Sequence, residues 1–204
     1  MATDTRPGVH ERIRADLRAT ARLLAELPDD HVVRIAQAAE RMAQALKAGH
    51  KIIWFGNGGS ATQSQHMAGE FVGRFRKERA PLPSLSLAEN MASVTAIGND
   101  YTFEQIFSRQ LAALSQPGDV AVGLSTSGNS PNVLRALREA KDLRVSTIGL
   151  TGGTGGAMAG LCDLCICVPS PITAHIQEVH LAIGHLLCGL VEDELATPGA
   201  RGAP

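Results

Sequence analysis

The chain has 204 residues and a formal net charge of −1, and 44% of its residues are apolar. A charge so close to zero argues against a nucleic-acid-binding protein, which would carry a basic patch. The apolar fraction is that of a compact globular protein, and the length allows one sizeable core.

The first fifty residues are predicted to form two helices. The opening segment, MATDTRPGVHERIRADLR, lacks the apolar core of a secretion signal, which favours a cytoplasmic protein. Apolar residues recur at helical spacing over about 8–27 and 31–48, and Pro28-Asp29-Asp30 between them is interpreted as a break and a cap. Because two helices bury little alone, we expect residues 1–50 to pack as an arm on the main body or on a neighbouring subunit.

Residues 51–195 are predicted to form one α/β domain. Strands are expected over 51–55, 83–87, 119–124, 144–150 and 163–168, and helices near 60–74, 90–97, 102–115, 130–141 and 174–195. Several of these strands are continuous apolar runs, as in a parallel sheet covered on both faces. The alternation predicts a doubly wound five-stranded sheet flanked by helices. Residues 196–204, rich in Pro, Gly and Ala, are expected to form a flexible tail.

Three glycines follow the first predicted strand. Gly56, Gly58 and Ala61 match G-x-G-x-x-A, a weak form of the dinucleotide fingerprint. That fingerprint requires an acidic residue about 20 positions later, and the nearest candidate, Glu89, lies too far along the chain. No lysine follows the glycines, which excludes a Walker phosphate loop. A dehydrogenase is therefore a poor interpretation of this loop.

A second loop, STSGNS, also joins an apolar strand to a helix. It carries four hydroxyl groups, on Ser125, Thr126, Ser127 and Ser130. The amides at a helix start attract an anion, and hydroxyl donors beside them suit a phosphate monoester. An ordinary serine–glycine turn is the alternative, but the glycine loop on a neighbouring strand favours a phosphate site.

Two predicted helices carry polar side chains that could act chemically. His66 and Glu70 are four residues apart and share one face of the helix after the glycine loop. The last long helix adds Gln177, Glu178, His180 and His185. Any one of these could be a hydrogen-bonded interior group, but their grouping near two phosphate-type loops favours a functional site.

The cysteines are not interpreted as a metal site. Cys162, Cys165 and Cys167 form C-x-x-C-x-C, but a structural zinc site normally pairs two such clusters. Cys165 and Cys167 share one face of a predicted strand, where a free thiol behaves as a small hydrophobe. Free thiols also fit a reducing compartment.

The motifs FGNGGSA, GND, STSGNS, TGG, the RF after GE, and IQEVHLAIGHLLC resemble the sugar-isomerase (SIS) family, and within it the phosphoheptose (sedoheptulose-7-phosphate) isomerases. The resemblance covers roughly residues 10–195. It implies an SIS-type fold, a homotetramer with active sites at subunit interfaces, and one zinc ion per subunit.

The resemblance also implies roles for individual residues. Substrate contacts fall on Asn57, Gly58, Gly59, Glu70, Asn99, Asp100, Ser125, Thr126, Ser127, Ser130 and Gln177. Zinc ligands fall on His66, Glu70, Gln177 and His185. His175 is a departure, because relatives usually carry arginine there; the position looks exposed and is not a ligand in the family.

The implied reaction is aldose–ketose isomerisation of sedoheptulose 7-phosphate to D-glycero-D-manno-heptose 7-phosphate or a closely related heptose 7-phosphate. Glu70 is the implied base that removes a proton from C1 to give an enediol, and His185 is its acid partner. Zinc would polarise the oxygens. Since a zinc-bound carboxylate or imidazole is a poorer proton carrier, it stays open whether the ligands exchange roles during turnover.

Two non-catalytic alternatives share the fold. Some SIS proteins bind the bacterial replication-initiator protein as tetramers, but they lack a glutamate and a histidine at the positions of Glu70 and His185. This chain has both. A regulator that senses sugar phosphates would share the phosphate loops, and only kinetics would separate it from an enzyme.

Overall fold

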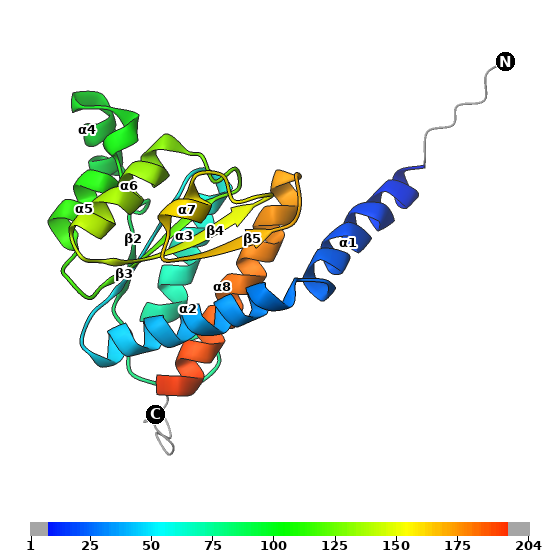
Figure 1. Cartoon of the computed structure of the whole chain (residues 1–204), viewed down its shortest axis with the longest axis horizontal. Helices are drawn as coiled ribbons and strands as arrows, with labels where there is room; N and C mark the ends of the chain where they lie inside the picture. Colours follow the sequence, from blue (N-terminus) through cyan, green and yellow to red (C-terminus); the bar gives the residue numbers. More distant parts are fainter. Residues whose placement is uncertain (1–7, 196–204) are drawn as a thin grey trace.

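The computed structural model describes residues 8–195, which form a three-layer α/β structure (Figure 1). Five parallel strands lie in the order β2-β1-β3-β4-β5. Their bounds are Ile52–Gly56 for β1, Ser84–Ser86 for β2, Val120–Ser125 for β3, Ser146–Gly152 for β4 and Leu164–Val168 for β5. The predicted five-stranded, doubly wound parallel sheet is confirmed.

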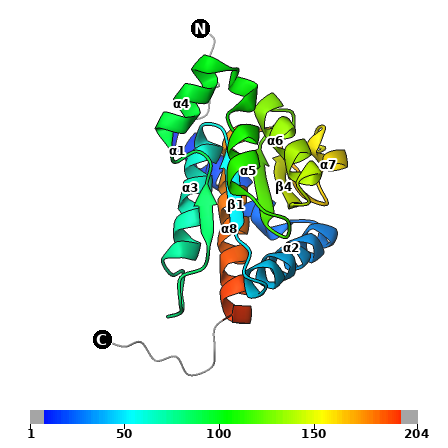
Figure 2. The same cartoon turned by 90° about the vertical axis from the view of Figure 1, so that its left-hand side faces the viewer.

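Helices cover both faces of the sheet, and Figure 2 shows α5 and α6 in front of the strands with α8 behind them. The first face packs against α2 (Asp29–Lys47), α3 (Gly59–Val72) and α8 (Thr173–Leu195). The second face packs against α4 (Met91–Asp100), α5 (Ser108–Leu114), α6 (Pro131–Asp142) and α7 (Met158–Leu161), and the 3₁₀ turn η1 (Phe103–Gln105) contacts α4, α5 and α6. Along β1, Ile52 and Trp54 enter the first core while Ile53 and Phe55 enter the second. This two-sided burial explains the continuous apolar strands.

Two local predictions differ from the structure, and one short helix was missed. The segment 102–115 is not one helix but η1 followed by α5. Between them lie Ile106 and Phe107, which are each only 2% exposed. The short helix α7 was not predicted. Helix α2 begins at Asp29, with Pro28 as its N-cap and no side-chain cap bond, so Asp29 and Asp30 belong to its first turn instead of capping it.

The two N-terminal helices differ in how they pack. Helix α2 lies along α8 and contributes Ile35 and Met42 to the first core. Helix α1 (Val9–Ala25) buries no residue and projects from the body in Figure 1, although Thr20 Oγ1 donates a hydrogen bond to Glu178 on α8. The division into an arm of residues 1–50 and a domain of residues 51–195 stays a prediction. The expected tail at 196–204 lies outside the described residues. Among residues 8–195, no helix is long and apolar enough to cross a membrane.

Candidate active site

The glycine loop after β1 and the serine loop after β3 lie side by side at the carboxyl edge of the sheet. Strands β1 and β3 are neighbours, with Gly56 paired to Leu124. The side-chain amides of Asn57 and Asn132 exchange two hydrogen bonds of 2.8 Å each across the loops. Asn132 is 1% exposed, and no sequence motif indicated a role for it. Because ligands of open α/β sheets bind at this edge, the two loops are placed to contact one ligand.

Two glycines give these loops their shape. Gly58, the N-cap residue of α3, has φ +56°, and Gly128 has φ +65° within the serine loop. A Cβ at Gly128 would lie 2.0 Å from the carbonyl oxygen of Gly155. Only glycine fits such a position. The serine loop therefore packs directly against the turn that follows β4.

The hydroxyl groups of the serine loop gather at the start of α6. Ser125 Oγ lies 2.9 Å from Ser130 Oγ and 3.4 Å from Ser127 Oγ. Ser127 Oγ also accepts a hydrogen bond from the backbone N–H of Asn129 at 3.1 Å. Pro131 is the first residue of α6, so the hydroxyls stand at a helix N-terminus, where an anion is favoured.

A polar cavity of about 300 Å³ opens beside this loop. It is lined by Thr126, Ser127, Asn129, Gly152, Gly153, Thr154, Gly156, Ser170, Pro171, Thr173 and Ile176. Its volume is at the low end of the range for small-molecule sites. The lining brings together the loops after β3, β4 and β5, of which only the first was predicted to bind phosphate.

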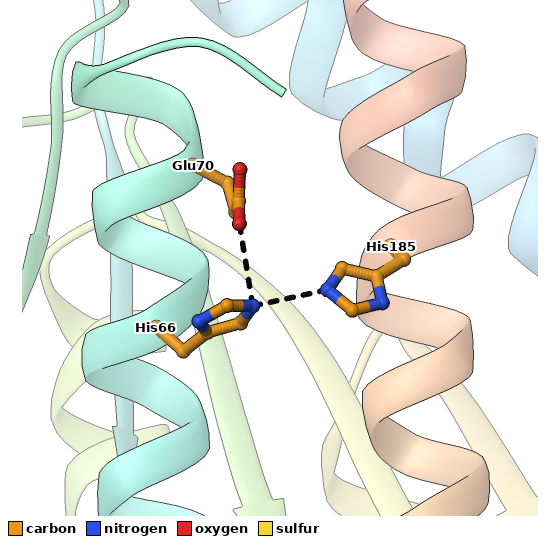
Figure 3. A group of neighbouring side chains, drawn as sticks. All are labelled: His66, Glu70 and His185. Carbon is orange, nitrogen blue, oxygen red and sulfur yellow. Dashed lines mark hydrogen bonds and ion pairs between the residues drawn. The ribbon is translucent and has the colours of Figure 1, made fainter. Parts of the chain in front are cut away.

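His66, Glu70 and His185 meet between α3 and α8 (Figure 3). His66 Nε2 lies 3.3 Å from Glu70 Oε1 and 3.0 Å from His185 Nε2. The two imidazole rings are nearly perpendicular, at 75° with centroids 5.2 Å apart. Sequence spacing predicted the pairing of His66 with Glu70, and the fold adds His185 from a helix more than a hundred residues later.

The surroundings of His185 favour a neutral imidazole. Partial burial lowers its pKa, the charge of His66 lowers it further, Glu70 opposes this, and Arg76 adds a smaller lowering. The ring of Phe75 stacks on His185 with a centroid distance of 5.3 Å and an angle of 14°. Phe75 belongs to the RF motif, for which the sequence predicted no role.

Other expected site residues lie apart from this triad in the single chain. The Gln177 amide sits against Gly59, whose Cβ, if present, would be 2.8 Å from Gln177 Nε2. Gly59 precedes His66 by seven residues, or about 10 Å along α3. Asn99 and Asp100 are exposed at the end of α4, where Asn99 Nδ2 donates to Asp100 Oδ1 at 2.8 Å.

The expected exposure of His175 is wrong, because this side chain is only 8% exposed. Helix α8 is contacted by α1, α2 and α3 as well as by β4 and β5, so its buried surface is wider than one face. Glu178 and His180 do not join the triad either. Glu178 is exposed beside α1, whereas His180 is buried and its Nε2 contacts the carbonyl oxygen of Thr151 at 3.0 Å.

The triad is chemically suited to hold a zinc ion. One ligand atom from each of His66, Glu70 and His185 lies within 4.8 Å of the others. Two histidines and one carboxylate form a common catalytic zinc set that leaves a position for water or substrate. These three residues therefore fit the implied metal, and the amide of Gln177, beside Gly59, does not join them in the single chain.

Comparisons with known proteins identify the family of the chain. The family model described as SIS domain matches residues 17–152. The phosphoheptose isomerase of Rhodospirillum rubrum is 53% identical over 93% of this chain and all of its own length, and that of Aquifex aeolicus is 48% identical over 90% and 96%.

Solved structures give the same result. The phosphoheptose isomerase of Neisseria gonorrhoeae superposes with a TM-score of 0.86 at 40% identity, covering 91% of this chain and 100% of the other. The enzyme from Francisella tularensis gives a TM-score of 0.82 at 38% identity, over 91% and 96%. These comparisons lend no support to the alternative of a replication-initiator-binding tetramer. The chain therefore belongs to the SIS-domain family and, within it, to the phosphoheptose isomerases.

Proposed function

We propose that this enzyme converts sedoheptulose 7-phosphate to D-glycero-D-manno-heptose 7-phosphate, or to a closely related heptose 7-phosphate. The observation that carries the proposal is the His66–Glu70–His185 triad, whose ligand atoms lie within 4.8 Å of one another, in a chain that also presents a hydroxyl-rich loop at a helix N-terminus. The names of the relatives support the same heptose phosphate.

The serine loop binds the phosphate group in this proposal. Ser127 is exposed at the cavity, and Ser125 and Ser130 are already within hydrogen-bonding distance of each other. Hydroxyl and backbone donors bind the phosphate equally in the ground state and the transition state, so this loop contributes binding more than rate. The glycine loop, tied to it through Asn57, contacts the sugar with its backbone.

Proton transfer between C1 and C2 needs one base and one acid near the sugar. Glu70, with a side chain 21% exposed, can accept the proton from C1 and leave an enediol. His185 is the acid partner at C2, where it would donate the N–H proton of its neutral imidazole. The 3.0 Å contact between His66 Nε2 and His185 Nε2 keeps the two rings together, and Glu70 lies one turn of α3 beyond His66.

One zinc ion per subunit is part of the proposal, with His66, Glu70 and His185 as ligands from this chain. Zinc bound there would polarise the substrate oxygens as a Lewis acid. The donor set of two imidazoles and one carboxylate supports it.

We also propose a homotetramer in the cytoplasm, with active sites completed by neighbouring subunits. Val9 and Leu17 on α1 are 67% exposed, which is unfavourable for large apolar residues unless another surface covers them. Asn99 and Asp100 are exposed on their own chain, and a neighbouring subunit would bring them to a substrate. The four free cysteines support a reducing compartment.

The decisive test incubates the purified protein with sedoheptulose 7-phosphate and follows the mixture by NMR. A new heptose phosphate should form, and the Glu70→Gln protein should form none at a comparable rate. An unchanged sedoheptulose 7-phosphate spectrum with folded, zinc-loaded protein would contradict the proposal and favour a sensing role.

A further inference from the structure

The segment between α3 and β2 is anchored by a buried carboxylate. Glu192 on α8 is 1% exposed. It accepts hydrogen bonds from three successive backbone N–H groups, those of Phe75, Arg76 and Lys77, at 3.1, 2.8 and 2.8 Å. Arg79 Nε donates to the same carboxylate at 3.1 Å. Burial acts to raise the pKa of Glu192, but these donors outweigh it and the pKa is lowered. The carboxylate is therefore a charged anchor with its acceptors occupied.

Arg79 uses its remaining nitrogens at the end of α3. Nη2 donates to the carbonyl oxygen of Glu70 at 2.8 Å, and Nη1 donates to those of Phe71 at 2.9 Å and Gly73 at 3.1 Å. The last carbonyls of a helix have no partner within the helix, so a side chain that binds them fixes its end. The Arg79–Glu192 pair thus ties the end of α3, which carries Glu70, to α8, which carries His185.

The anchored segment places one aromatic ring against the site. Phe75 is half-buried and stacks on His185, and the guanidinium of Arg76 lies 4.7 Å from the centre of the Phe75 ring. Glu192 follows His185 by seven residues, which puts both on nearly the same side of α8, about two turns apart. The anchor and the stacked ring therefore act along one side of that helix.

We infer that Phe75 is a positioning residue for His185, and that the Arg79–Glu192 pair acts by holding Phe75 in place. A ring stacked at 14° restricts rotation of the imidazole and keeps Nε2 directed at His66. Without it the imidazole would explore other orientations, and the proton would be offered to the substrate less often. The inference deepens the proposed function, because it rests on the role of His185 in that reaction.

The experiment compares Phe75→Leu with Phe75→Tyr. Leucine keeps apolar volume but removes the flat ring, so the ring-current shift of the His185 C–H resonances should disappear from the NMR spectrum. The kcat should fall by about 10- to 100-fold, the size expected when a reacting group is misplaced by about 1 Å. The KM for the sugar phosphate and the inhibition constant of inorganic phosphate should not change. The Phe75→Tyr protein keeps the stacked ring, so its His185 resonances and its kcat should match those of the wild type.

Two further variants separate this role from general packing. Val72→Ala alters an exposed side chain at the end of α3 and should leave the His185 resonance and kcat unchanged. Glu192→Gln removes the anchoring charge, and in folded protein it should displace the same resonance. A Phe75→Leu protein with a wild-type His185 resonance or a wild-type kcat would overturn the inference. A Phe75→Leu protein in which phosphate binding weakens by the same factor as kcat falls would also overturn it. A wild type that does not isomerise the heptose phosphate would refute the proposed function, whereas the resonance would still show whether Phe75 orients His185.

Discussion

Asn57 and Asn132 join the glycine loop to the serine loop through two reciprocal 2.8 Å hydrogen bonds between their amides. Asn132 Oδ1 also accepts the backbone N–H of Val133 at 3.0 Å, which fixes the amide relative to α6. The two loops approach a ligand from neighbouring strands, so this pair sets the spacing between the groups that bind phosphate and those that bind sugar.

Asn132→Ala should therefore lower kcat/KM for the heptose phosphate by about 10- to 100-fold, because the sugar is misplaced relative to the triad. Inhibition by inorganic phosphate, which needs only the serine loop, should change little. Val133→Ala is the matched control, since Val133 is buried next to Asn132 but packs into the second core. Equal losses in both variants, measured well below their unfolding temperatures, would show that Asn132 acts only through the packing of α6.

Glu70→Gln should abolish turnover while the fold survives. Glutamine has the same shape, and Arg79 contacts the backbone carbonyl of Glu70 instead of its carboxylate, so the end of α3 keeps its anchor. Loss of a positioned general base typically costs about 10²- to 10⁴-fold in rate. The measurement is kcat together with thermal unfolding, and a kcat near that of the wild type would remove Glu70 from the mechanism.

Ser130→Ala should raise KM for the phosphorylated sugar more than it lowers kcat, because a phosphate contact is present in the ground state and the transition state alike. Ser130 is the N-cap residue of α6 but makes no side-chain cap bond, so the helix should lose little stability. Ser127→Ala should act in the same direction, although its hydroxyl also holds the N–H of Asn129.

Ser115→Ala is the control for the serine loop, since this hydroxyl donates to the carbonyl of Leu111 within α5. Its kinetics should match those of the wild type. An unchanged KM combined with equal falls in kcat and kcat/KM for Ser130→Ala would contradict the phosphate-binding role.

Much of the fold was predictable because each strand carries its own signal. Two-sided burial favours apolar residues at successive strand positions, so the run Ile52–Phe55 predicts β1 without any knowledge of its neighbours. Predictions failed where distant contacts override local pattern. Ile106 and Phe107 are buried at the junction between η1 and α5, and α8 has neighbours on several sides, so that His175 is buried as well.

The candidate site was only partly predictable for the same reason. The spacing of His66 and Glu70 reveals their pairing, because both lie on one helix. The contacts of Asn132 with Asn57, of Phe75 with His185 and of Arg79 with Glu192 join separate elements. The positions of these residues in the sequence do not indicate which element each side chain will contact.

His180 should make stability depend on pH. Burial lowers its pKa from 6.5 to about 4, only partly offset by the hydrogen bond with Thr151. The unfolded chain therefore binds a proton more readily, so the stabilisation is complete above pH 6.5 and is lost as the pH falls toward 4. The loss at pH 5 should be about 2 kcal/mol in the free energy of unfolding. Urea unfolding of wild type and His180→Gln at pH 7.5 and 5 measures it, and equal losses in both proteins would contradict the assignment.

Zinc content should follow the triad and not the cysteines. His185→Asn should lower both bound zinc and activity, and a strong chelator should inactivate the wild type. Cys165→Ser and Cys167→Ser should keep wild-type zinc. Cys165 contacts Cys162 and is buried, both of which raise the pKa of its thiol, and burial raises that of Cys167 to about 11, so neither readily forms the thiolate that a metal requires.

The remaining ligand assignment concerns Gln177, whose amide lies beside Gly59 instead of the triad. If Gln177 binds the metal of a neighbouring subunit, Gln177→Ala should weaken zinc binding in the assembled protein. If Gln177 contacts only the sugar, the same variant should raise KM with zinc content unchanged. These cases are distinguished by metal analysis and the isomerase assay on five proteins: the wild type and the His185→Asn, Cys165→Ser, Cys167→Ser and Gln177→Ala variants. Zinc that follows the cysteines, or a metal-free protein that isomerises at full rate, would show that the triad is not a zinc site.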